Sequence, residues 1–175
     1  MSIKINSKIL NELVSEQKLA ILKKPQKKAG NINYFITPSL CLELYNAKVV
    51  FSTPSYIVFE FDKVQHVNLL SMLQSIDKQL QYYLRTSFHI DNEQVQIHQI
   101  YFDKESTFTI RCSLPSFGRH PSIKYLVYAD VNGEDCPFKV PRNNIILTKI
   151  SVDIRNFWES QSRIGYNLEL KRVSY

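Results

Sequence analysis

The sequence predicts a mainly β protein of the α+β class. Stretches of alternating apolar and polar residues recur along the chain, turn residues separate them, and one long amphipathic helix interrupts them. A chain of 175 residues is long enough to bury one core of its own. Strands spaced by turns around a single helix therefore predict either an all-β barrel or a compact α+β domain.

The N-terminal part is expected to form a helix and a basic linker over residues 1–30, followed by a single β domain over 31–175. Apolar residues recur at helical spacing over 6–23, and Pro25 ends the helix. This helix either packs on its own sheet, which its periodicity favours, or serves for docking or dimerisation. The lysine-rich run over 23–28 either contacts phosphate, acts as a nuclear-import patch, or is a solvated loop.

Extended segments are expected on both sides of a helix over 63–86, whose apolar residues follow a three-four spacing. Two strand candidates lie within 39–61, where Pro54 separates them. The later candidates are 94–102, 106–113, 122–129, 136–140, 145–155 and 165–173. Asn132-Gly133 predicts a tight turn because this pair tolerates positive φ, and Arg163-Ile164-Gly165 is expected to form another turn.

Composition favours an acidic partner over a membrane or a nucleotide cofactor. The net charge is +6 and aromatic residues make up 12% of the chain, a combination typical of nucleic-acid-binding proteins. Only four glycines are present, and no glycine-rich phosphate loop occurs. No apolar run is long enough to span a membrane, and the N-terminus lacks the pattern of a secretory signal. An intracellular protein, cytoplasmic or nuclear and not secreted, is expected.

Catalytic and metal-binding patterns are missing from the sequence, so a non-enzymatic protein without a cofactor is expected. None of the four histidines lies in a recognisable nucleophile motif such as GxSxG, and no DxD or ExxE pair that would hold magnesium occurs. The three cysteines are far apart, which predicts reduced, buried thiols. A zinc site built from them with His98 or His120 is the weaker alternative, because structural zinc ligands come in close pairs.

Cations and aromatic residues share the segments that are predicted to be β. Single-stranded nucleic acid needs charge for its phosphates and flat faces for its bases. The candidate binding residues are Arg111, Phe117, Arg119, Lys124, Tyr128, Lys149, Arg155, Trp158 and Arg163. A structural role competes with this interpretation. Phe117 can equally cover the end of the core, and a single tryptophan such as Trp158 after a strand more often packs in the core or at its rim.

The C-terminal segment over 150–173, ISVDIRNFWESQSRIGYNLELKRV, has a hydrophobic strand, a bulky aromatic connection, and a glycine-aromatic start of a final strand with a basic end. This pattern resembles the closing strands of single-stranded DNA-binding proteins with an OB-fold (oligonucleotide/oligosaccharide-binding fold) from phages and large DNA viruses. The resemblance implies a viral protein with an OB-like five-stranded barrel, an inserted helix, a basic aromatic groove and a role in DNA replication. Replicative members often end in an acidic tail that recruits partners, whereas this sequence ends LKRVSY.

Two functions follow as expectations. The first is sequence-independent binding of single-stranded DNA, or of RNA, in replication or repair, with replication proteins and a second copy of the chain as further partners. The second is a structural or assembly module, either a virion component or an accessory subunit, whose exposed aromatics and N-terminal helix meet protein instead of bases.

Overall fold

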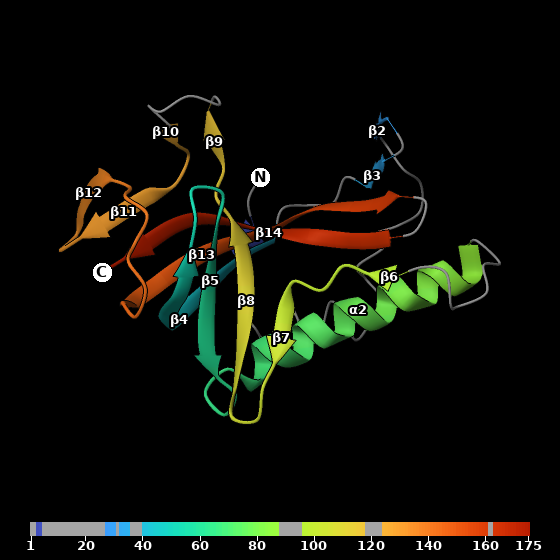
Figure 1. Cartoon of the computed structure of the whole chain (residues 1–175), viewed down its shortest axis with the longest axis horizontal. Coiled ribbons are helices and arrows are strands. Elements are labelled where there is room, and N and C mark those ends of the chain that lie inside the picture. Colours follow the sequence, from blue (N-terminus) through green and yellow to red (C-terminus); the bar gives the residue numbers. More distant parts are fainter. Residues whose placement is uncertain are drawn as a thin grey trace.

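The structure is a computed structural model, and it describes residues 3–4, 27–30, 32–35, 40–87, 96–117, 124–160 and 163–175. Within these residues the protein is mostly β with one helix, α2 (Val67–Ser87), as Figure 1 shows. The mainly β prediction is therefore confirmed at this level. The helix that the sequence predicts over 6–23 lies outside the described residues.

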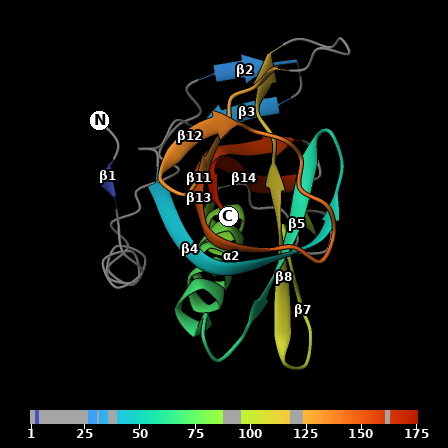
Figure 2. The same ribbon diagram turned by 90° about the vertical axis from the view of Figure 1, so that its left-hand side faces the viewer.

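Five strands close into a ring. They are β4 (Leu40–Ser52), β5 (Tyr56–Asp62), β8 (Thr107–Ser113), β13 (Ile146–Ser160) and β14 (Arg163–Ser174). β4, β5 and β8 form an antiparallel meander, β8 then pairs in parallel with β14, and β14 pairs antiparallel with β13. The ring closes because β13 also pairs antiparallel with β4. Figure 2 shows these strands from one end.

Apolar side chains at alternate positions along the strands fill the inside of the ring. On β5 the side chains of Ile57, Phe59 and Phe61 are fully buried, while the residues between them point outward. Phe108 and Ile110 on β8 are buried in the same way. Because successive side chains of a strand point to opposite faces, one set of residues forms the core and the other forms the outer surface of the ring.

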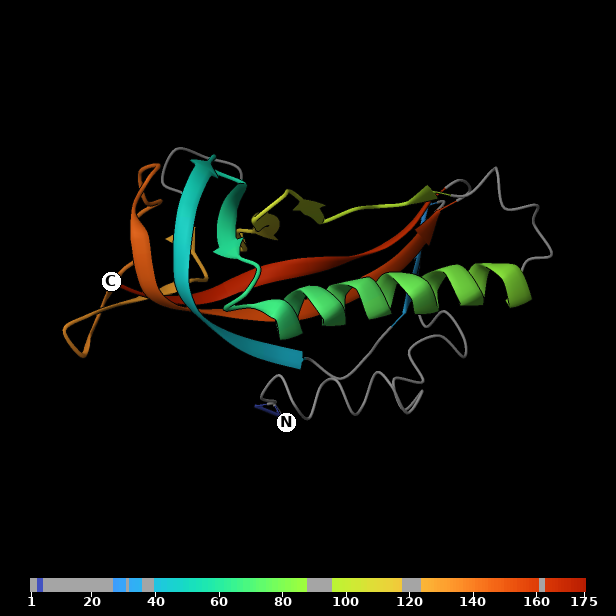
Figure 3. The ribbon, with the colours of Figure 1, turned by 90° about the horizontal axis from the view of Figure 1, so that it is seen from below.

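The β13–β14 hairpin continues beyond the ring, as Figures 1 and 3 show, and α2 runs along it. On this outer part β3 (Ile32–Phe35) pairs with β13, and β2 (Lys27–Ala29) pairs with β3. β6 (Gln96–Ile97) pairs with the start of β14. Lys27 and Lys28 of the predicted basic linker therefore lie in a strand.

Short strands extend the sheet elsewhere. They are β1 (Ile3–Lys4) on β4, β7 (Tyr101–Asp103) on β8, β11 (Tyr128–Val131) on β14 and β12 (Glu134–Pro137) on β11. A separate ribbon joins β9 (Ser116–Phe117) to β10 (Lys124–Tyr125). Asn132 and Gly133 connect β11 to β12 with φ values of 55° and 87°, so the predicted tight turn is confirmed.

The predicted helix over 63–86 is confirmed as α2, with a later start. Residues 63–66 form a turn before it, and Oδ1 of Asp62 accepts hydrogen bonds of 2.9 Å from the backbone amides of Val64 and Gln65. The carboxylate thus satisfies amides that have no partner within the turn. The buried face of the helix consists of Leu69, Leu70, Met72, Leu73, Ile76 and Leu80. Within the described part of the chain, no helix combines the length and apolar character needed to span a membrane.

Several predicted strand limits are wrong. The segment over 94–102 splits into β6 and β7 around residues 98–100, and the segment over 122–129 splits into β10 and β11. Arg163-Ile164-Gly165 is not a turn, because these residues begin β14 and pair with β13. The alternation of Ile146 with Ile150, Val152 and Ile154 in the sequence predicts that Ile146 lies on their apolar face, yet it is 61% exposed and its neighbour Leu147 is buried.

Candidate nucleic-acid interface

The outer face of β5 and β8 carries an aromatic ring beside a guanidinium group. Tyr56 and Arg111 both lie on the outward side of the alternation, two residues apart in the antiparallel register. The Cζ atom of Arg111 lies 4.1 Å from the ring centroid of Tyr56, a cation–π contact. The ring of exposed Phe51 on β4 lies 5.9 Å from that of Tyr56. Two aromatic rings and one cation therefore form a cluster beside the β4–β5 turn.

Hydrogen bonds within the β4–β5 turn hold Tyr56 in place. The Thr53 hydroxyl oxygen accepts hydrogen bonds from the backbone amides of Ser55 (3.2 Å) and Tyr56 (3.1 Å). The backbone amide of Thr53 donates to the carbonyl of Tyr56 at 2.9 Å. Threonine suits this position because its short hydroxyl reaches nearby backbone groups.

A short segment without regular structure, residues 98–100, links β8 to the start of β14. The amide of Arg111 donates to the carbonyl of Ile100 at 2.8 Å, and the amide of His98 donates to the carbonyl of Ile164 at 2.8 Å. The segment thus hydrogen-bonds to both strands where β8 and β14 separate, and His98 lies between the two strands.

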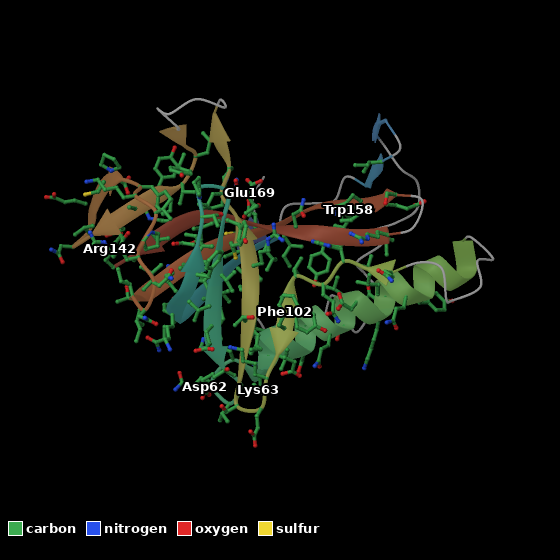
Figure 4. All side chains as sticks on the ribbon, in the orientation of Figure 1. Asp62, Lys63, Phe102, Arg142, Trp158 and Glu169 are labelled. Atoms are coloured by element: carbon green, nitrogen blue, oxygen red, sulfur yellow. The ribbon has the colours of Figure 1, made fainter. Side chains whose placement is uncertain are left out.

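Trp158 lies over a glycine on the extended hairpin. It is opposite Gly165 in the β13–β14 register, and its ring lies 5.6 Å from that of His98 at an interplanar angle of 50°. A Cβ atom on Gly165 would lie 2.8 Å from Cβ of His98 and 3.1 Å from Cζ2 of Trp158. Glycine leaves the space that both rings occupy, and Trp158 remains half-buried. Figure 4 shows Trp158 on the part of the hairpin that projects from the ring.

Two arginines act on His98. Its pKa is lowered below the ordinary value, first by partial burial and then by the positive charges of Arg111 and Arg163. Both arginines are exposed, and neither pairs with a carboxylate within the described residues. We refer to the whole surface as the aromatic–basic face, which consists of Phe51, Tyr56, His98, Arg111, Trp158 and Arg163.

The opposite end of β5 has a different electrostatic character. Glu60 pairs with Lys48 at 3.3 Å and with Lys104 at 3.0 Å. The hydrogen bond from Lys104 is the main reason that the pKa of Glu60 is lowered, and Lys48 adds to it. Lys63 pairs with Asp103 at 2.6 Å, near Asp62 in Figure 4. Lysines at this end therefore have carboxylate partners, so the aromatic–basic face stops before it.

Three of the residues that the sequence predicts for binding, Arg111, Trp158 and Arg163, come together on the aromatic–basic face. Lys149 does not, because it lies on the outer side of β4 and β13, 2.9 Å from Glu43 and 5.9 Å from the ring centroid of Tyr45. The interaction with Glu43 raises the pKa of Lys149. Tyr128 is 62% exposed, but it lies on β11, opposite Arg172 in the register of β14.

For three of the four other predicted residues the structure gives only the backbone pairing, and the fourth lies outside the described residues. Phe117 and Lys124 face each other in the ribbon of β9 and β10. Arg155 pairs with Asn167 in the hairpin, just before an irregularity that ends at Trp158. Arg119 lies outside the described residues. These four residues stay predictions.

Sequence reasoning missed Phe51, Tyr56 and His98 as surface residues. For Tyr56 a signal existed, because it alternates with Ile57 and Phe59 and so belongs to the polar side of its strand. For Phe51 and His98 there was none: a bulge in β4 follows Val49, and a break in the strand precedes Tyr101.

The described residues contain no group of three or more His, Cys, Asp or Glu side chains arranged to hold a metal ion. Cys41, Cys112 and Cys136 are free thiols, as the sequence predicts. Cys112 is fully buried, and burial raises the pKa of its thiol well above the ordinary range.

Comparison with solved structures finds phage proteins. One match is gp2.5, a single-stranded DNA-binding protein encoded by bacteriophage T7, with a TM-score of 0.39 and 11% identity over 79% of this chain and 91% of that one. Another is the single-stranded DNA-binding protein of bacteriophage Enc34, in complex with single-stranded DNA, with a TM-score of 0.40 and 14% identity over 86% of this chain and 92% of that one.

Both neighbours belong to the class of protein that the sequence resemblance names. No protein-family model matches the chain, and no curated protein matches it in sequence. Because both TM-scores are low, the structural similarity carries no argument about function. An argument about function must therefore come from the residues of this chain.

Proposed function

We propose that the ring is an OB-type barrel and that the protein binds single-stranded DNA without catalysing a reaction. In an OB-fold, oligonucleotides bind on the face of the second and third strands and between the loops that join strands one to two and four to five. The corresponding elements here are β5, β8, the β4–β5 turn and the β13–β14 hairpin. The aromatic–basic face runs over these elements, together with Phe51 at the end of β4 and His98 in residues 98–100.

The chemistry of this face suits a flexible strand. Tyr56, Phe51 and Trp158 offer rings on which bases can stack, and stacking tolerates any base because every base has a flat face. The arginines offer charge for phosphates and release counterions when they bind. Stacking on rings and contacts to phosphates do not distinguish one base from another, so we expect sequence-independent binding. A role in replication or repair follows from this activity.

The observation that carries the proposal is the position of Arg111 and Arg163. Arg111 lies 4.1 Å from the ring centroid of Tyr56, and Arg163 is near enough to His98 for its charge to act on the titration of that residue. Neither arginine has a carboxylate partner within the described residues. Six cations elsewhere do have one, namely Lys48, Lys63, Lys104, Lys149, Lys171 and Arg172. Unpaired arginines beside exposed rings are the combination that phosphates and bases need.

A titration with oligo-dT tests the proposal. Trp158 is the only tryptophan, so its fluorescence reports the hairpin directly, and a mobility shift gives an independent readout. We expect quenching on binding, and affinity that falls as salt rises, with a slope of about −0.7 per phosphate contact for single strands. The double variant Arg111→Ala with Arg163→Ala should lower the slope by about 0.7 if the two arginines share one phosphate and by about 1.4 if they contact two, and it should lower the affinity at low salt by at least about tenfold.

The matched control is Lys139→Ala with Arg142→Ala. It removes the same charge from exposed positions, and Figure 4 shows Arg142 at the other end of the molecule from Trp158. If both double variants weaken binding equally, the net charge matters and the face does not. If the wild-type protein does not bind oligo-dT at low salt by either readout, the proposal is wrong.

A further inference from the structure

The gap between β8 and the start of β14 holds three nitrogen-rich side chains. Two backbone hydrogen bonds of 2.8 Å border this gap, one from the amide of Arg111 to the carbonyl of Ile100 and one from the amide of His98 to the carbonyl of Ile164. Arg163 lies next to Ile164 at the start of β14, where it pairs with Gln96. Both arginines lie near enough to His98 to act on its titration. Two positive charges thus act on one imidazole.

Gly165 and Trp158 border the imidazole on two sides. Its Cβ lies close above Gly165, where an added methyl group would come within 2.8 Å of it, and its ring lies against Trp158. An arginine presents several N–H donors in a planar fork that matches the oxygens of a phosphate. A single anion held between two such forks has the imidazole as its third neighbour.

We propose that Arg111, His98 and Arg163 form the seat of one phosphate group of the bound strand, and that seating this phosphate places a proton from solvent on His98. The inference rests on the proposed function and adds the position of a backbone contact and its dependence on pH. Trp158, beside the seat, then stacks on a base next to the seated phosphate.

The direction of the pH effect follows from the groups around His98. From β8 it faces Arg111, from β14 it faces Arg163, and from β13 it faces the uncharged ring of Trp158. Within the described residues no carboxylate contributes to its titration. In the free protein both arginines and partial burial therefore keep the imidazole neutral at pH 7. A bound phosphate neutralises the arginines and attracts the proton, so the pKa of His98 is higher in the complex than in the free protein.

A group whose pKa rises on binding makes binding tighter as the pH falls. Affinity for oligo-dT should therefore increase about threefold to tenfold from pH 7.5 to pH 5.5 at constant salt, since one proton can contribute at most tenfold per pH unit. The salt slope should stay about the same at the lower pH, because His98 joins a phosphate that the two arginines already contact and the slope counts phosphates.

The test compares the wild type with His98→Gln and with His66→Gln as the matched control. His66 lies outside the face, where its Nε2 is 2.9 Å from the carbonyl oxygen of Tyr45. Circular dichroism melts at each pH establish that all three proteins are folded. The affinity of each protein at pH 8 is its own reference, which separates a loss of binding at every pH from a loss of the pH response. At pH 5.5 His98→Gln should lack the gain in affinity, whereas His66→Gln should show it.

Calorimetry in two buffers of different ionisation enthalpy should detect uptake of protons on binding by the wild type and none by His98→Gln. Binding that is independent of pH in the wild type, or a pH response that His98→Gln retains, overturns the inference and leaves the proposed function intact. Absence of binding at every pH overturns the proposed function itself, so the two failures are distinguishable.

Discussion

The guanidinium carbon of Arg111 lies 4.1 Å from the ring centroid of Tyr56, across the pair of strands β5 and β8. Arg111 lies over the ring of Tyr56, and its positive charge also acts on the titration of His98. The imidazole of His98 in turn lies against the ring of Trp158. Arg111 therefore joins the part of the aromatic–basic face near the β4–β5 turn to the part on the β13–β14 hairpin. A DNA strand that binds as we propose would pass Arg111 where it crosses the aromatic–basic face.

Tyr56→Ala should weaken binding of oligo-dT by about 5- to 150-fold, because a stacked base contributes roughly 1–3 kcal/mol. Tyr56→Phe should bind like the wild type, since it keeps the ring. Affinities from fluorescence anisotropy at one salt concentration check both expectations. Tyr82→Ala is the control, since it removes a tyrosine that is 69% exposed on α2. Equal losses in the Phe and Ala variants would show that the hydroxyl matters and stacking does not.

Arg163→Ala and Lys149→Ala separate a cation on the aromatic–basic face from a paired cation elsewhere. Both residues were candidates from sequence. We expect Arg163→Ala to lower the salt slope of binding by about 0.7, the contribution of one phosphate contact. Lys149→Ala should leave the slope unchanged, because Lys149 pairs with Glu43 at 2.9 Å on another side of the ring. Salt titrations of both variants check this, and a lower slope for Lys149→Ala would extend the binding surface to β4 and β13.

Gly165→Ala should destabilise the protein by about 1–3 kcal/mol, the usual cost of forcing a methyl group into a packed site. The new Cβ would meet His98 and Trp158, so the emission of Trp158 in the folded protein should also shift. Urea unfolding and fluorescence spectra measure the two effects. Gly133→Ala is the control, because its φ of 87° strains an alanine although no atom lies within 4 Å. It should lower stability without changing the emission, and a wild-type spectrum for Gly165→Ala would contradict the packing described.

Asp77 on α2 should make stability depend on pH. Burial raises the pKa of its carboxyl to about 6, against the nearby hydroxyls of Tyr101 and Tyr166, which lower it. No partner meets hydrogen-bond geometry at Asp77 Oδ1 or at the Tyr166 hydroxyl, and both atoms are buried. Because the pKa in the folded state exceeds that in the unfolded chain, the folded state binds more protons between about pH 4 and 6. This group therefore makes the protein less stable as the pH rises through that window.

Asp77→Asn removes the charge at nearly constant shape. The difference in free energy of unfolding between variant and wild type, measured in urea from pH 4 to 8, should change between about pH 4 and 6 and be constant above. Above pH 6 the variant should be at least as stable as the wild type. Glu60 titrates in both proteins, so its opposite contribution cancels in the difference. A constant difference over the whole range would mean that the Asp77 carboxyl titrates normally.

Local patterns in the sequence were sufficient to predict β5, β8, α2 and the turn at Asn132-Gly133. Each depends on the spacing of side chains along a few residues, because a strand alternates with period two and a helix repeats every 3.6 residues. The same patterns predicted wrong strand limits where pairing with a neighbouring strand determines where a strand begins or ends. Arg163 belongs to β14 and not to a turn because its backbone pairs with Ser160 and Gln96.

The sequence by itself determined the β character, the positive charge and the supply of cations and aromatic rings. It could not determine which of them are exposed or which of them meet, because strand order and register depend on how distant segments bury their apolar faces against each other. The pairing of β8 and β6 with β14 places Arg111 and Arg163 where both act on His98, and the register of β13 with β14 sets Trp158 opposite Gly165. Only the tertiary structure joined these residues with Tyr56 and His98 into one face and left Lys149 on another.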